Sequence, residues 1–282
     1  MSDEFLICTN GHETTWPAIE YGAWAATSTQ GRVTLLGIAE QRGGASIDTK
    51  PPLEDIFARA VQLFEEKGVQ YTLEVRNGDA EQIIPPEANK RGGITVIGRL
   101  ARPRLRRFFA GRSIRHLLAE IASPILYVPQ VCLPLKKMLV CSGGLGYEVS
   151  AEQVAIRLGL ATRAQMILLH VAPPVDLDYP SARAEQEHWR ELGKANTLSG
   201  RNLRQAQDAA RAAGLEAEIR ARQGNVVEEI LAEIKGGNYD LVCMGSPYGG
   251  HGLRHLYGPN VTDEVAERAE CPILTARYAR GK

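Results

Sequence analysis

Short apolar runs alternate with amphipathic stretches along the whole chain. In the first half, the apolar and β-branched runs predict strands at 5–9, 32–39, 70–76, 93–97 and 124–128. The stretches between them predict helices at 15–28, 53–67, 79–91 and 112–122. Continuous apolar strands separated by helices are typical of a parallel sheet that is covered on both faces. Because crossovers between parallel strands are right-handed, the pattern predicts an α/β, doubly wound, Rossmann-like domain.

The same pattern occurs again in the second half. FLICTNG (5–11) matches MLVCSGG (138–144), and ITVIG (94–98) matches DLVCMG (240–245). The offset grows from 133 to 147, so the second copy carries fourteen extra residues, which we assign to a long helical stretch at 181–213. Prolines within 128–136 indicate a linker. The sequence therefore predicts two tandem Rossmann-like, doubly wound domains at 1–131 and 136–282, each with a five-stranded parallel sheet.

Composition narrows the class of protein. The 282 residues carry 33 basic and 33 acidic side chains, so no net charge attracts nucleic acid or an anionic membrane. No apolar run approaches the roughly 18 residues that a membrane-spanning helix needs. The chain begins with an acidic segment, unlike a secretory signal, and its five cysteines form no CxxC pair. We expect a cytoplasmic protein with no membrane contact and no specific nucleic-acid partner.

A glycine-rich segment follows the fourth strand of the second copy. Glycines occupy 245, 249, 250 and 252, and the segment closes at Gly258-Pro259-Asn260, where the pattern predicts the start of the last helix. Glycine lets main-chain amides approach an anion, and a helix N-terminus offers free N–H groups and a partial positive charge. The segment is a candidate phosphate site. A glycine-rich surface loop without a ligand is the alternative.

These segments resemble the universal stress protein family. The fourth strand, the glycine loop, the last helix and CPIL (271–274) carry the resemblance, together with LLHVAPP after the second strand. It covers both halves and implies doubly wound domains that dimerise and, in one subgroup, bind ATP. We therefore expect the two halves to pack as an intramolecular pseudo-twofold pair, with a further homodimer as a second level of assembly.

The family's nucleotide-binding motif is glycine, two residues, glycine, nine residues, then glycine followed by Ser or Thr. The resemblance places an adenine-nucleotide site in the second domain, with a cofactor-binding set of Gly143, Val171, Gly245, Gly249, Gly250, Gly258 and Asn260. Gly143 stands where the family has an aspartate that contacts the nucleoside, Tyr248 replaces the middle glycine, and Pro259 replaces the hydroxyl residue. We expect ATP binding that is weak or absent, with another small anion as the alternative ligand.

The first copy departs from the motif in a different way. It has Asn10 at the aspartate position, Ala101 at the middle glycine and Arg112 at the hydroxyl residue. Seven arginines and no acidic residue lie between Arg99 and Arg115. They predict either an anion-binding segment or a solvated basic loop.

Two other readings of function stay open. CSGGLGYEVS (141–150) resembles the opening of the PP-loop ATP pyrophosphatases, although Gly146-Tyr147 stand where those enzymes have Asp-Ser. That resemblance implies an ATP-using enzyme, and a scaffold without any small ligand is the third reading. The six histidines form neither a catalytic constellation nor a metal site with nearby acidic or cysteine ligands. The leading hypothesis is a non-enzymatic, metal-free stress-response protein that binds a ligand or regulates a partner.

Overall fold

A computed structural model describes residues 3–40, 52–100, 110–143, 149–172, 194, 196–246 and 261–277. The chain divides into two compact units, with the boundary between Val131 and Cys132. Most of the arginine-rich segment, the middle of the CSGGLGYEVS loop, and Gly249, Gly250, Gly258 and Asn260 lie outside the described residues.

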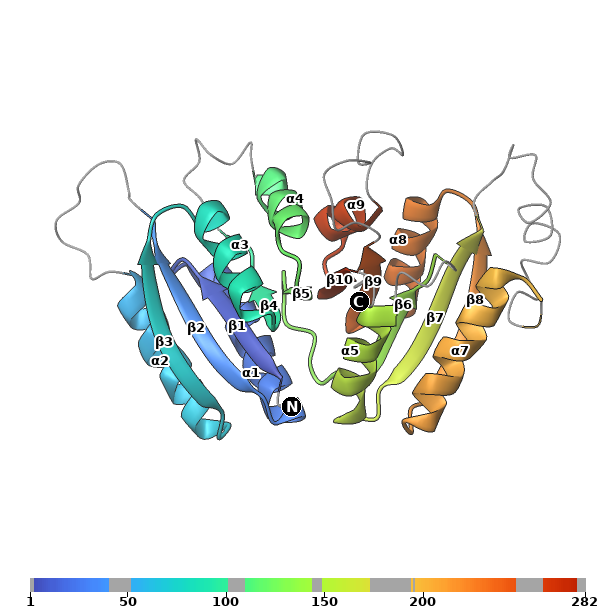
Figure 1. The fold of residues 1–282 in the computed structure, drawn as a ribbon, viewed down its shortest axis with the longest axis horizontal. Helices are drawn as coiled ribbons and strands as arrows, with labels where there is room; N and C mark the ends of the chain where they lie inside the picture. Colours follow the sequence, from blue (N-terminus) through green and yellow to red (C-terminus); the bar gives the residue numbers. More distant parts are fainter. Residues whose placement is uncertain are drawn as a thin grey trace. The chain divides into compact units, whose positions relative to one another are not determined.

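The first unit is a parallel sheet with helices on both faces (Figure 1). Its strands are β1 (Glu4–Thr9), β2 (Arg32–Ala39), β3 (Gln70–Asn77), β4 (Ile94–Ile97) and β5 (Ile125–Tyr127). Its helices are η1 (Glu13–Thr15), α1 (Trp16–Thr29), α2 (Pro52–Glu66), α3 (Ala80–Arg91) and α4 (Ala110–Glu120). The strand order within the unit is β3-β2-β1-β4-β5, and every pair is parallel.

The second unit repeats this topology. Its strands are β6 (Lys137–Cys141), β7 (Gln165–Ala172), β8 (Ala217–Gln223), β9 (Leu241–Ser246) and β10 (Ile273–Arg277). Its helices are α5 (Val149–Leu160), α7 (Leu198–Ala212), α8 (Val226–Gly237) and α9 (Val261–Arg268). The order is β10-β9-β6-β7-β8, again with parallel pairs. The predicted fold class, two tandem Rossmann-like units with five-stranded parallel sheets, is confirmed. The predicted pseudo-twofold packing of the two units stays a prediction.

The inner strands are buried on both faces, which explains their continuous apolar runs. All but the first residue of β1 and all of β4 are buried, as is most of β2. The outer strand β3 differs, because no residue along it is fully buried. Within the described residues, no helix is long and apolar enough to cross a membrane.

One predicted helix is shorter than expected. The stretch 181–213 was predicted to be helical throughout, whereas α7 begins only at Leu198. Thr197 has extended backbone (φ −90°, ψ 164°), and its hydroxyl oxygen accepts a hydrogen bond from the N–H of Gly200 at 3.1 Å. This side chain accepts a hydrogen bond from a free N–H of the first turn and so caps the N-terminus of α7. The prediction of one helix that continues through residue 197 is therefore wrong. Residues 173–193 lie outside the described residues.

The strand registers show which residues of the two units are equivalent. Leu36 pairs with Cys8 and Glu74, and Leu169 pairs with Cys141 and Arg220. The equivalent residues are therefore 133 positions apart in the first two strands and 146 apart in the third. Each described strand residue of the first unit therefore has a definite counterpart in the second unit.

Candidate functional site

The topology places a switch point at the same position in each unit. In the first unit β1 lies between β2 and β4, and in the second β6 lies between β7 and β9. Successive connections leave in opposite directions from these two strands. In doubly wound sheets ligands bind at such a point, outside the carboxyl ends of the strands.

In the first unit this edge is occupied by the protein's own carboxylate. Glu40, directly after β2, accepts hydrogen bonds from the Asn10 side-chain amide (3.3 Å) and from the N–H of Ala80 at the start of α3 (3.4 Å). A carboxylate that bridges the end of β1 and a helix N-terminus uses donors that a ligand anion would need. It also repels a phosphate. The first unit is therefore poorly suited to an anion at this position.

Gly98, after β4 in the first unit, is also in contact with the chain itself. A Cβ on Gly98 would lie 2.9 Å from the Cα of Thr15 and 3.2 Å from the carbonyl oxygen of Thr14. The Thr14 hydroxyl donates a 2.6 Å hydrogen bond to the carbonyl oxygen of Arg99. The absence of a side chain at Gly98 thus allows the segment after β1 to pack against the segment after β4.

The described residues leave the equivalent edge of the second unit more open. Gly143, the counterpart of Asn10, follows the end of β6, and among the described residues a Cβ built on it would meet no heavy atom within 4 Å. Just before it, the N–H of Ser142 donates to the Leu169 carbonyl (2.8 Å), and the ring Nδ1–H of buried His170 donates to the Ser142 carbonyl oxygen (2.9 Å). The end of β6 is held in place by these bonds, and no described residue fills the space beside Gly143.

Val171 lies in β7, where its side chain is buried. Its main chain is directed toward the β6 side of the strand. The carbonyl of Leu169 accepts from Ser142 on that side, and the carbonyl of Ala172 accepts from Gly224 on the other side. Because main-chain groups alternate along a strand, the N–H and C=O of Val171 face the end of β6 at Gly143.

Gly245 was predicted to be the first residue of a loop, and this prediction is wrong. It belongs to β9, where it pairs with Ala276 of β10, and the hydroxyl of Thr262 in α9 lies 3.5 Å from its carbonyl oxygen. The strand continues because β10 runs alongside it as far as Arg277. Gly143, Val171 and Gly245 nevertheless lie at the carboxyl ends of three adjacent strands, since β6 lies between β7 and β9.

The helix expected to face a phosphate begins directly after Asn260. Helix α9 starts at Val261, and its first turn carries Asp263 and Glu264. Acidic side chains in a first turn stabilise the helix by interacting with the positive end of its dipole. They also reduce the positive potential that this helix end offers to an anion.

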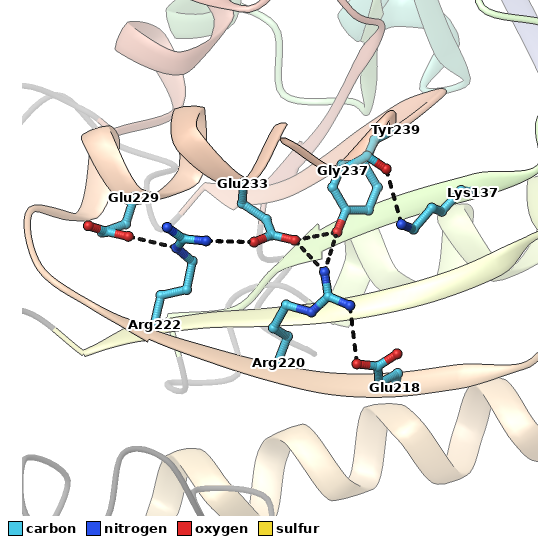
Figure 2. A network of polar contacts seen from close by, with 8 residues as sticks. All are labelled: Lys137, Glu218, Arg220, Arg222, Glu229, Glu233, Gly237 and Tyr239. Atoms are coloured by element: carbon cyan, nitrogen blue, oxygen red, sulfur yellow. Dashed lines mark hydrogen bonds and ion pairs between the residues drawn. The ribbon is translucent and has the colours of Figure 1, made fainter. Parts of the chain in front are cut away.

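Sequence reasoning missed a cluster of charged side chains on the α8 face of the second unit. Glu233 of α8, with only 6% of its side chain exposed, accepts hydrogen bonds from Arg220 Nη1 (2.6 Å), Arg222 Nη1 (2.9 Å) and the Tyr239 hydroxyl (2.6 Å), as Figure 2 shows. Burial raises the pKa of the Glu233 carboxyl, but the bonds from Tyr239, Arg220 and Arg222 outweigh burial and hold the pKa below its ordinary value. We call these four residues the Glu233 cluster.

Neighbouring side chains join the Glu233 cluster to the end of α8. Lys137 of β6 donates to the carbonyl oxygen of Gly237 (3.0 Å), and its ammonium group lies 4.7 Å from the centre of the Tyr239 ring (Figure 2). A cation at a helix C-terminus satisfies a free carbonyl and interacts favourably with the dipole. The cluster therefore fastens α8 to β8 and β6. The sequence signals for the cluster were two arginines two positions apart in β8 (220 and 222) and two glutamates four positions apart in α8 (229 and 233).

The first unit has a related cluster at equivalent positions. Glu87 of α3, the counterpart of Glu233, pairs with Arg91 and, at 3.2 Å, with Arg76 of β3. Arg91 also pairs with Glu74 at 2.8 Å. In this unit the second cation comes from the helix itself, whereas in the second unit both arginines come from the outer strand. Both clusters hold a helix against an outer strand, which indicates a structural role.

The residues that the structure describes contain no group of three or more His, Cys, Asp or Glu side chains placed to hold a metal ion. Two of the six histidines, His251 and His255, fall in 247–260, outside the described residues. Cys8 is fully buried, and burial raises the pKa of its thiol, so it is suited to the core and not to nucleophilic chemistry.

The strand order and the crossover pattern define each unit as a Rossmann-like α/β domain. The model of the universal stress protein family matches residues 1–129 and 134–277. The chain therefore belongs to the universal stress protein family, and it contains two tandem copies of the family domain.

Individual relatives agree with this assignment. The chain is 21% identical over 305 residues to universal stress protein Slr1230 of Synechocystis sp., covering 96% of this chain and 99% of the relative. It is 27% identical over 146 residues to universal stress protein YxiE of Bacillus subtilis, covering 50% of this chain and 98% of the relative. The fold is similar to a crystal structure of a universal stress protein from Archaeoglobus fulgidus, with a TM-score of 0.69, 16% identity, and coverage of 100% of this chain and 98% of that one.

Proposed function

We propose that this tandem universal stress protein is a stress-response binding protein that holds an adenine nucleotide weakly in its second unit and does not turn it over. The observation that carries the proposal is the contrast between the two switch points. In the first unit Glu40 takes the donors at the edge, whereas in the second unit no described residue fills the space beside Gly143. The ligand's base would lie near the main chain of Val171, and its phosphates near the segment between Gly245 and α9.

Several features point to low affinity. Gly143 has no side chain to hold a ribose, and Asp263 and Glu264 weaken the positive end of α9. A hydrogen bond to a charged group contributes about 1.5–3 kcal/mol, so each missing contact lowers affinity by roughly tenfold to a hundredfold. The proposed role is therefore sensing or regulation through occupancy.

Isothermal titration of the full chain with ATP, ADP and AMP tests the site. Gly143→Val fills the open position without backbone strain, because Gly143 does not adopt a positive φ. This variant should abolish any binding. Asn10→Val changes the equivalent position of the first unit and should leave binding unchanged, which makes it the matched control. Binding that survives Gly143→Val but is lost in Asn10→Val would place the site in the first unit and overturn the proposal.

The ATP-using enzyme is distinguished by its products. Incubation with ATP, magnesium and candidate acceptors, followed by analysis of the nucleotides, should show ATP unchanged. Conversion of ATP to AMP and pyrophosphate would favour the PP-loop enzyme. If no nucleotide binds at millimolar concentration, the proposal fails and the scaffold without a small ligand is the better description.

A further inference from the structure

The outer strand of the first unit has an unpaired edge. Strand β3 ends the strand order of its unit, and its pairing in the described residues is with β2 alone. All eight of its residues follow one continuous register against β2, from Gln70 opposite Arg32 to Asn77 opposite Ala39. The strand contains no proline and no bulge, which are common means of blocking further pairing at an edge.

The hydrogen bonds of the sheet show which main-chain groups face outward. The N–H of Arg32 donates to Asp3 on the β1 side of β2, and the N–H of Gly78 donates to the carbonyl of Ala39 on the β3 side. The even-numbered residues of β3 therefore turn their main chain toward β2, because main-chain groups alternate along a strand. The N–H and C=O groups of Tyr71, Leu73, Val75 and Asn77 face away from the sheet.

The same edge exposes large apolar side chains. Leu73 is 40% exposed and Val75 is 50% exposed, and both lie on one face of the strand. At the equivalent positions of β8, the outer strand of the second unit, Ile219 and Ala221 are only partly exposed. One of the outward carbonyls, that of Val75, accepts a 3.1 Å hydrogen bond from Nη1 of Arg76. An edge with outward-facing main-chain groups and exposed apolar side chains is a template for another strand.

We propose that this edge pairs with β3 of a second copy of the chain, in antiparallel orientation about a twofold axis at Val75. Val75 then lies opposite its own counterpart and exchanges main-chain hydrogen bonds with it, which replace the bond from Arg76 to the Val75 carbonyl. Leu73 lies diagonal to the other copy's Val75, so four apolar side chains form one row. The pairing extends a five-stranded sheet of each copy into a sheet that continues across the dimer.

Charge complementarity selects both the partner and the register. With the axis at Val75, Glu74 of each copy lies opposite Arg76 of the other, and two opposite-charge pairs form on the second face. An axis at Glu74 would place two carboxylates opposite each other, and an axis at Leu73 would place Glu74 opposite Thr72. Within one copy Glu74 and Arg76 pair with each other at 2.9 Å, and also with Arg91 at 2.8 Å and Glu87 at 3.2 Å, respectively. Both keep exposed surface (25% and 44%), so the pairs across the axis replace the Glu74–Arg76 pair of each copy. The segment is therefore self-complementary.

The first test is sedimentation velocity of the full chain over a concentration series, with Val75→Pro and Val75→Lys as variants. Proline removes an N–H that faces away from β2, so β2–β3 pairing survives, and residue 74 is already extended as proline requires. We expect a reversible dimer for the unmodified chain and a dissociation constant raised about tenfold or more in both variants. Leu160→Lys, at a 43% exposed position of α5, is the control and should dimerise normally.

The second test examines the register. Glu74→Arg and Arg76→Glu should each be monomeric, because like charges then face each other across the axis, whereas an equal mixture of the two should form a heterodimer. Circular dichroism of each variant checks that it is folded. A monomer at every concentration of the unmodified chain would overturn the proposal, as would a dimer that persists in Val75→Pro and Val75→Lys. Failure of the mixture to associate would refute the register. None of these outcomes depends on nucleotide binding.

Discussion

Replacing Glu233 by glutamine tests whether the Glu233 cluster holds the second unit together. Removing one partner of a buried ion pair costs about 3–5 kcal/mol, since the other charge is left uncompensated. Here Arg220 and Arg222 keep 34% and 35% of their side chains exposed, and glutamine retains one acceptor for their hydrogen bonds. Solvation of the arginines should lower the cost to about 2 kcal/mol. The measurement is urea unfolding at neutral pH, with hydrogen exchange of β8 and α8 to locate the loss.

Glu218→Gln is the matched control for this prediction. Glu218 contacts the same Arg220 at 3.2 Å, but its side chain is 53% exposed, and ion pairs of that kind contribute about 0–1 kcal/mol. If the two variants are destabilised equally, burial of Glu233 does not determine the energy of the cluster. A loss below about 0.5 kcal/mol in Glu233→Gln would refute the reasoning.

The pH dependence supplies a second check. The pKa of Glu233 is lower in the folded protein than its ordinary value. Its contribution to stability is therefore fully present above the unfolded-state pKa of about 4.3 and is lost as the pH falls through the folded-state pKa. The difference in unfolding free energy between wild type and Glu233→Gln should be largest near neutral pH and shrink as the pH falls below the unfolded-state pKa. A difference that stays constant over this range would contradict the assigned ionisation.

Three smaller predictions concern other parts of the chain. Asn225→Ala should destabilise α8 by about 1 kcal/mol in urea unfolding, because its side-chain oxygen accepts two main-chain N–H bonds of the first turn. Gly22→Ala should cost about 1–3 kcal/mol, since a Cβ there lies 2.5 Å from a buried isoleucine, whereas Gly236→Ala, with open space around it, should be neutral or stabilising. In a thiol-reagent assay of the folded protein Cys132 should react and Cys8 should not; rapid labelling of Cys8 would show that β1 opens readily.

The fold could be predicted from the sequence because its signals are local. Burial on both faces requires a continuous apolar run, so β1, β2 and β4 are visible in the chain without any knowledge of their neighbours. Because the sequence repeats, each strand predicted in the first half also predicted an equivalent strand in the second half. The same reasoning overextended the helix before α7, because a single capping threonine, Thr197, weighs little against a long helical pattern.

The candidate site was only partly predictable. The positions of Gly143 and Val171 at adjacent strand ends follow from the order of strands in a doubly wound sheet, and the structure places them there. Gly245 was assigned to a loop because a glycine after an apolar run usually ends a strand. Whether the strand continues depends on how far β10 runs beside it, and that length is set by a segment about thirty residues later.

By itself, then, the sequence determined the two α/β domains, their strands and the family, because apolar periodicity and repeated motifs are recorded residue by residue. Only the tertiary structure decided which contacts the residues at equivalent positions of the two repeats make. Gly98 and Gly245 occupy the same place in the two repeats, yet one accommodates the Thr15 backbone and the other pairs in a strand. Glu40 fills the first edge because Asn10 and Ala80, distant in sequence, meet it there. Such differences arise from contacts between remote residues, and a repeat in the sequence carries no record of them.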